Sequence, residues 1–212
     1  MQHDFLKKIY SHREGYIALY KGLHTLPHLV KNISKKHLSR QFIERIMLAV
    51  TEVNGCEVCA YGHTKMALEH GMSHEEIGQI LSGDCSSINE DELVAVMFAQ
   101  HYADTRGNPS TESWERVIDH YGNEKSMVIL SATRMIMIGN IFGIPLSALL
   151  RRLKRKKVLK TGPLYEITML VGALLLGPLA LAHALLLILL QVPVSFQLSV
   201  AEKSASQDIL TP

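Results

Sequence analysis

Apolar residues recur at helical spacing along almost the whole chain, and no convincing run alternates apolar with polar residues as a strand would. The clearest stripe lies in LSRQFIERIMLAVTEV, where one helix face carries Ile43, Ile46, Met47 and Val50. Ser39 is placed to cap this helix at its N-terminus, and Asn54-Gly55 is expected to end it. The pattern therefore predicts an all-α fold.

Further helices follow from the same spacing. We expect them over residues 5–20, 23–33, 56–70, 73–81, 90–104, 111–121 and 124–142. Pro27 should interrupt the second of these helices, and Gly71 should stop the third. The segment SHEE, which begins at Ser73, fits a capping box that opens the helix over residues 73–81.

The C-terminal part of the chain departs from this amphipathic pattern. Residues 167–190 contain 24 positions without a formal charge, and such a helix would extend about 36 Å, enough to cross a bilayer core of about 30 Å. We prefer a transmembrane helix over residues 167–191, because soluble helices rarely lack a polar stripe for so long. The alternative is a hairpin of two short helices, hinged at Gly177-Pro178 and docked on the domain or on a sister subunit.

The distribution of charge along the chain also predicts how a membrane span would be oriented. The net charge is +2, but residues 151–160 contribute seven positive charges and no negative ones, so the remainder sums to −5. A mildly acidic body with one basic patch argues against a general nucleic-acid-binding protein. Because positive residues beside a span tend to stay in the cytoplasm, the sequence predicts a single-pass membrane protein with its domain in the cytoplasm.

The predicted organisation therefore has four parts. A helical domain covers residues 1–150, a basic linker 151–166, a transmembrane helix 167–191, and a short polar tail 192–212. The N-terminus shows no apolar stretch or cleavage site typical of a secretion signal. A reducing compartment is therefore expected, and there a CxxC pair is more often catalytic or metal-binding than structural.

Candidate chemistry is concentrated in NGCEVCAYGH, residues 54–63. On a helix, Cys56, Cys59 and His63 share one face. A thiol at the helix N-terminus is favoured as thiolate, the histidine can accept a proton, and two thiols three residues apart can close to a disulfide. Two alternatives stay open: a zinc site completed by His70, Glu52 or a partner residue, and a pair that only fills the core.

The same region resembles a known family. The segment LSRQFIERIMLAVTEVNGCEVCAYGH is similar to the core of the AhpD-like alkylhydroperoxidases, within the carboxymuconolactone decarboxylase-like superfamily. That family carries Glu, eleven residues, Cys, two residues, Cys, three residues and His, and Glu44, Cys56, Cys59 and His63 fit without a gap. The resemblance covers roughly residues 20–150 and excludes residues 167–212.

The resemblance implies a helical, oligomeric protein, with trimers common among the relatives, that reduces hydroperoxides through a thiol–disulfide cycle and needs no cofactor. By analogy, Cys59 is the peroxidatic thiol and Cys56 condenses its sulfenic acid to a disulfide. Glu44 and His63 form a proton relay, through a water, that serves Cys59 and the leaving alkoxide. A dithiol or a thioredoxin-like protein is the expected reductant. The lactone decarboxylase branch is disfavoured, because the CxxC pair marks the thiol branch.

Some positions depart from the family pattern or lie outside it. Val58 stands where the best-known member has a second histidine, which puts the peroxidase rate in doubt. Glu52 either joins the relay or solvates a helix end, and Arg134 and Asn140 are weaker candidates to approach the site. Cys85 is expected to be an incidental thiol. A membrane-tethered thiol–disulfide exchange or scaffold protein without peroxide turnover is the alternative function.

Overall fold

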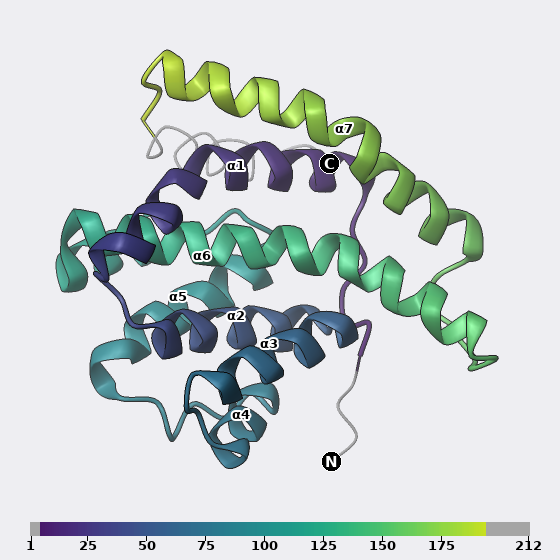
Figure 1. Ribbon diagram of the computed structural model, residues 1–212, viewed down its shortest axis with the longest axis horizontal. Coiled ribbons are helices and arrows are strands. Elements are labelled where there is room, and N and C mark those ends of the chain that lie inside the picture. Colours follow the sequence, from purple (N-terminus) through teal and green to yellow (C-terminus); the bar gives the residue numbers. More distant parts are fainter. Residues whose placement is uncertain (1–4, 194–212) are drawn as a thin grey trace, which may run out of the picture.

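The computed structural model describes residues 5–193, which form α-helices and contain no strand, so the all-α prediction is confirmed (Figure 1). The helices are α1 (His12–Lys35), α2 (Arg40–Asn54), α3 (Glu57–Glu69), α4 (His74–Leu81), α5 (Glu90–Asp104), α6 (Thr111–Leu153) and α7 (Pro163–Leu189). The predicted polar tail lies almost wholly outside the described residues. The division into domain, linker, span and tail stays a prediction.

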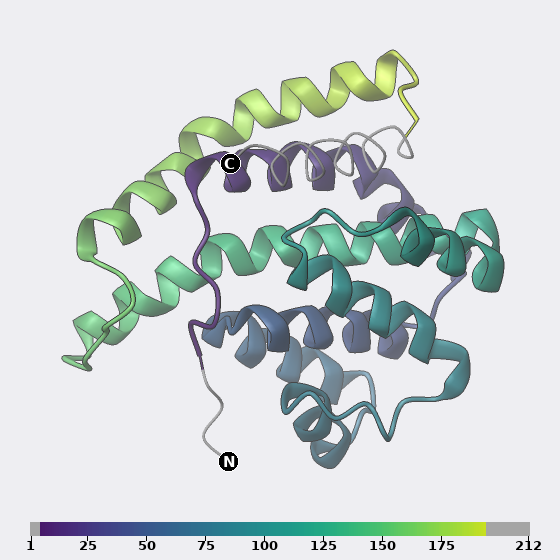
Figure 2. The ribbon, with the colours of Figure 1, turned by 180° about the vertical axis from the view of Figure 1, so that it is seen from behind.

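The long helix α6 crosses the middle of the molecule. Helices α1 and α7 lie on one side of it, and α2 to α5 lie on the other, as the two opposite views show (Figures 1 and 2). Helix α6 contacts α1, α2, α3, α5 and α7, and its buried face supplies much of the main core, including Ile129, Leu130, Ile141 and Ile144. A smaller apolar cluster joins Leu48 of α2 to Ile80 of α4.

The cap positions predicted between residues 39 and 81 are confirmed, although within the described residues only the Ser73 half of the predicted capping box is formed. Ser39 accepts a hydrogen bond from the backbone of Phe42 at the start of α2, and Ser73 accepts one from Glu76 at the start of α4. Gly55 ends α2 in the left-handed region, with φ 73°. These local signals act within one turn of the chain, which is why the sequence alone could place them.

The first two predicted helices are a single helix, α1, and the predicted break at Pro27 is wrong. Proline removes one backbone donor and strains the preceding turn. The helix continues because both ends are capped, by the reciprocal Ser11–Glu14 capping box and by Lys36 in the left-handed region. Its contacts with α6 and α7 further stabilise it.

The two helices predicted over residues 111–142 are joined into α6, with a break in helical geometry at Gly122 (φ 72°, ψ 166°). The second of them extends to Leu153 instead of ending near residue 142, and it includes Pro145. This extension carries Gly143 and Ser147 against the first turn of α3, where they contact the cysteine motif.

Helix α7 is one helix that includes Pro178, and it does not form the hairpin considered as an alternative. It contacts α1 and α6. The fully buried Glu166 accepts a 2.9 Å hydrogen bond from the Nε of Arg152. Farther along the helix, Nδ1 of His183 lies 3.1 Å from the hydroxyl of Tyr16, and its ring stacks on Tyr20 at 4.4 Å between centroids.

Two of the described helices, α6 and α7, are long and apolar enough to cross a membrane. The apolar window of α6 is 72% buried, as expected for the core helix of a soluble domain, whereas that of α7 is only 11% buried. The outer face of α7 exposes a series of leucines: Leu164, Leu174, Leu175, Leu179, Leu185, Leu186 and Leu189. By composition and exposure, α7 is therefore the candidate membrane span.

Candidate functional site

The cysteine motif lies at the turn between α2 and α3. Cys56 is the N-cap of α3 and is fully buried, whereas Cys59, in the first turn, is partly exposed. The two residues form a disulfide, with Cα atoms 5.3 Å apart. The backbone N–H of Cys59 points at Cys56 Sγ, 3.3 Å away. A thiolate on Cys56 would thus receive a helix N-terminal donor.

The N-terminal segment, residues 5–11 before α1, fixes the turn that precedes Cys56. The backbone N–H of Leu6 donates to the carbonyl of Gly55 at 2.7 Å, and the hydroxyl of Tyr10 donates to the side-chain oxygen of Asn54 at 2.5 Å. A Cβ at Gly55 would lie 2.6 Å from the backbone nitrogen of Lys7. Both the left-handed conformation and this close approach therefore require glycine here.

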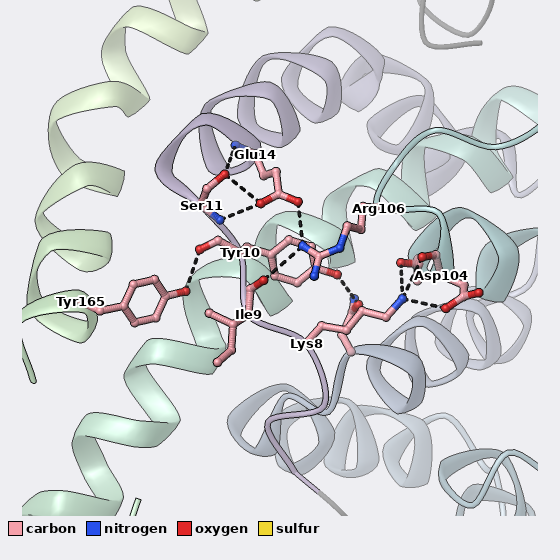
Figure 3. A network of polar contacts seen from close by, with 10 residues as sticks. Lys8, Ile9, Tyr10, Ser11, Glu14, Asp104, Arg106 and Tyr165 are labelled. Atoms are coloured by element: carbon pink, nitrogen blue, oxygen red, sulfur yellow. Dashed lines mark hydrogen bonds and ion pairs between the residues drawn. The ribbon is translucent and has the colours of Figure 1, made fainter. Parts of the chain in front are cut away.

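The N-terminal segment is itself held by three other parts of the chain (Figure 3). Arg106 donates to the carbonyl of Ile9 at 3.1 Å and to Glu14 at 2.7 Å. Lys8 binds Asp104 at 2.8 Å. The hydroxyl of Tyr165, on α7, donates to the carbonyl of Tyr10 at 2.8 Å. The turn before Cys56 is thus positioned by contacts from the end of α5, from Arg106 in the loop after α5, and from α7.

Helix α6 closes the site behind the sulfur atoms. A Cβ placed at Gly143 would lie 2.6 Å from Cys56 Sγ and 2.7 Å from Cys59 Sγ. Ser147, one turn later, accepts a hydrogen bond from the backbone N–H of Val58 at 3.2 Å and donates to the carbonyl of Gly143 at 2.7 Å. The absence of a side chain at Gly143 is what allows α6 to lie directly against the disulfide.

The other two predicted site residues meet each other. Nδ1 of His63 lies 2.8 Å from Oε2 of Glu44, a contact that joins α3 to α2. The Glu44 side chain is 4% exposed and that of His63 is 17% exposed. Residues four apart on a helix have Cβ atoms about 5–6 Å apart, so His63 lies one turn beyond Cys59 on the same side of α3. All four residues of the predicted motif therefore lie on the adjoining parts of α2 and α3.

The weaker candidates have other surroundings. Glu52 forms an ion pair with Lys7 at 2.5 Å, which favours the helix-end role over the relay. The Nε of Arg134 donates to the hydroxyl of Tyr102 at 3.3 Å, in the core between α5 and α6. Asn140, one turn before Gly143 on α6, accepts a hydrogen bond from the hydroxyl of Thr51 at 3.2 Å. Burial raises the pKa of the Cys85 thiol, which makes this residue a poor nucleophile.

A pocket of about 650 Å³ lies beside the motif, and no residue pattern predicts it. Its walls come from α3, α4, the C-terminal part of α6 and Phe5. Val58, between the two cysteines, lines this pocket, whereas Cys56 and Cys59 themselves do not. No group of three His, Cys, Asp or Glu side chains within residues 5–193 is arranged to hold a metal ion.

The fold and the site define a class of protein: an all-helical chain with a redox-capable cysteine pair at a helix N-terminus, beside a buried Glu–His pair. Residues 20–99 match the model of the carboxymuconolactone decarboxylase family, which includes the AhpD-like proteins. The matched range contains Glu44, Cys56, Cys59 and His63. No curated protein and no solved structure matches the chain.

Proposed function

We propose that the protein is a thiol-dependent peroxidase that reduces hydroperoxides through a dithiol–disulfide cycle. The observation that carries this proposal is the joining of Cys56 and Cys59 at the N-terminus of α3, one turn from a histidine that is bonded to a buried carboxylate. These groups supply a nucleophile, a resolving thiol and a proton carrier, which are the parts that such a cycle needs.

In the first step, the thiolate of Cys59 attacks the outer oxygen of the hydroperoxide, the O–O bond breaks, and Cys59 becomes a sulfenic acid. The leaving alkoxide takes one proton and departs as an alcohol. We assign this role to Cys59 because it is partly exposed, whereas Cys56 is fully buried. His63 takes the thiol proton and returns it to the alkoxide through a water, while Glu44 orients the ring through Nδ1.

In the second step, the thiolate of Cys56 attacks the sulfenic sulfur of Cys59, and hydroxide leaves and is protonated to water. The donor from the backbone N–H of Cys59 stabilises the attacking thiolate. In the third step, an external dithiol is oxidised to its disulfide and restores both thiols by exchange. The two electrons that reduce the peroxide therefore come from that dithiol.

The test is a mass measurement on the reduced full-length protein after one equivalent of a hydroperoxide. We expect loss of two hydrogens as the disulfide forms, recovery with dithiol, and catalytic peroxide consumption. Cys59→Ser should abolish consumption, Cys56→Ser should stop at a sulfenic acid that a dimedone probe traps, and Cys85→Ser should behave as wild type. If no hydroperoxide is consumed with any dithiol but protein thiols are oxidised, the exchange function replaces this proposal.

We further propose that α7 anchors the protein as a single membrane span with the helical domain in the cytoplasm, and that the protein is a homo-oligomer. The exposed leucine face of α7 and the seven positive charges of residues 151–160 support the membrane assignment. Release from membranes by carbonate would contradict it, and so would labelling, from the cytoplasmic side, of a cysteine introduced into residues 192–212. Light scattering of the detergent-purified protein tests the oligomer.

A spanning α7 has one further requirement. In the arrangement described here, α7 packs along α1, with His183 against Tyr16 and Tyr20, and α1 carries charged residues that a bilayer core would not accept. The span must therefore leave α1. A Tyr20→Cys/His183→Cys pair, in a background without the native cysteines, should cross-link in detergent and not in membranes. Complete cross-linking in membranes would instead indicate a helix that stays docked and lies flat on the bilayer.

A further inference from the structure

The pocket beside the cysteine motif has the size and the lining of a ligand site. Its volume of about 650 Å³ lies within the range of about 300–1,000 Å³ that is usual for small-molecule sites. Apolar side chains come from four separate parts of the chain: Phe5, Val58, Ile77, Leu81 and Leu150. A ligand that fills this space must therefore bring an apolar body.

The charged residues of the pocket favour an anion. Arg151, Lys154 and Lys156 line it, and Glu57 supplies its one carboxylate. That carboxylate already accepts a hydrogen bond from the Nε of Arg151 at 2.5 Å. The two lysines are exposed, and neither forms an ion pair with any residue of the described range. The lining thus has two ammonium groups that no protein group neutralises.

We propose that this pocket binds a single-chain anionic amphiphile, such as a fatty acid or an alkyl phosphate. The hydrocarbon chain lies against Ile77, Leu81 and Leu150, and the anionic head binds Lys154 and Lys156. A neutral apolar ligand would gain nothing from the two ammonium groups, and a small anion would leave the apolar wall in water. The site is separate from the thiol chemistry, so it does not depend on the peroxidase proposal.

Gly78 of α4 provides a direct way to fill the pocket. It lines the pocket, and a Cβ placed on it meets nothing within 4 Å. A phenylalanine at this position can therefore occupy the ligand space without first displacing a neighbour. Alanine at the same position leaves most of the space open, and both substitutions remove a helical glycine. Gly78→Phe and Gly78→Ala are thus a matched pair of variants.

The experiment uses the full chain in nanodiscs of zwitterionic lipid, with dodecanoate that carries a photoreactive diazirine on its chain as the probe. After irradiation, adducts should map to residues 74–81 and 147–150, and unlabelled dodecanoate should suppress them. Dodecanol and inorganic phosphate should not suppress these adducts. Suppression by dodecyl phosphate as well extends the site to any anionic head, and its absence restricts the site to carboxylates; both results support the proposal.

Two pairs of variants test whether the adducts arise from a probe bound in the pocket. Gly78→Phe should lose them and Gly78→Ala should keep them, with unchanged circular dichroism in both. Lys156→Glu should lower labelling about tenfold, as expected for loss of a charge-assisted hydrogen bond. Lys157→Glu, next to it but outside the pocket lining, should not. Equal labelling of the two Gly78 variants, equal losses in the two lysine variants, or adducts spread along α7 would each overturn the proposal.

Discussion

Substitution of Gly143 by alanine tests the packing of α6 against the disulfide. The new Cβ would lie 2.6 Å from Cys56 Sγ, 2.7 Å from Cys59 Sγ and 3.1 Å from a methyl group of Val58. None of these atoms is the free end of a long side chain, and the two sulfurs are held by their bond to each other. Either α6 or the first turn of α3 must therefore move.

The size of the effect follows from two opposing contributions. Overpacking a close-fitting core costs about 1–3 kcal/mol, whereas replacing a helical glycine by alanine gains up to about 1 kcal/mol. Gly139, one turn earlier on α6, is exposed, and its added Cβ would meet only Ile136 at 3.7 Å. Gly139→Ala therefore gains the same helix propensity without the clash. The difference between the two variants should be about 1–3 kcal/mol.

The assay is thermal unfolding of both oxidised variants in one detergent, followed by circular dichroism. For a chain of this length, about 1 kcal/mol lowers the melting temperature by about 2–4 °C, so Gly143→Ala should melt about 2–12 °C below Gly139→Ala. Gly143→Ala should also shift the equilibrium with a dithiol buffer toward the reduced form, measured by alkylation and mass. Equal melting temperatures and equal redox equilibria for the two variants would refute the argument.

Three further predictions concern other buried polar groups. Glu44→Gln removes the carboxylate that contacts Nδ1 of His63 at 2.8 Å and should lower kcat/KM for hydroperoxide by about a hundredfold without a change in fold. Burial, aided by Arg134, lowers the pKa of Lys21 to about 8. Between pH 8 and 10.5 the unfolded state then binds more protons than the folded state, so the free energy of unfolding should rise by about 1.6 kcal/mol from pH 8 to 9.5. Urea titrations of Lys21→Met should lack this rise. Arg152→Met, which leaves the carboxylate of Glu166 buried without its cation, should cost about 3–5 kcal/mol and lower the melting temperature more than Glu166→Gln.

The parts of the fold that the sequence could predict are those set by local contacts. The two ends of α2 depend on Ser39 and Gly55, and the start of α4 depends on Ser73; each of these residues acts within one turn. The spacing of Glu44 and His63 could be matched to a family pattern. Their 2.8 Å contact joins two different helices, so the distance itself required the structure.

The incorrect predictions share a different cause. Pro27 carries a strong local signal for a break, yet α1 continues because its faces pack against α6 and α7. Tertiary contacts overrode the local preference. The length of α6 was underestimated for the same reason: its last turns carry Ser147 and Arg151 to partners on α3, which a helical pattern read along the chain does not reveal.

The segment over residues 5–11 differs most from its prediction: the sequence pattern predicts the start of a helix, and the structure shows a non-helical strap. Its backbone binds Gly55, immediately before the buried Cys56, and the carbonyl of its Tyr10 accepts a hydrogen bond from the hydroxyl of Tyr165 on α7. Gly55 lies 49 positions after Leu6, and Tyr165 lies 155 positions after Tyr10. Several of the contacts use backbone groups, which leave no residue pattern. The same strap supplies Phe5 to the pocket. The cysteine turn, the pocket and the first turn of α7 are therefore held by one short segment, which periodicity could not distinguish from a helix.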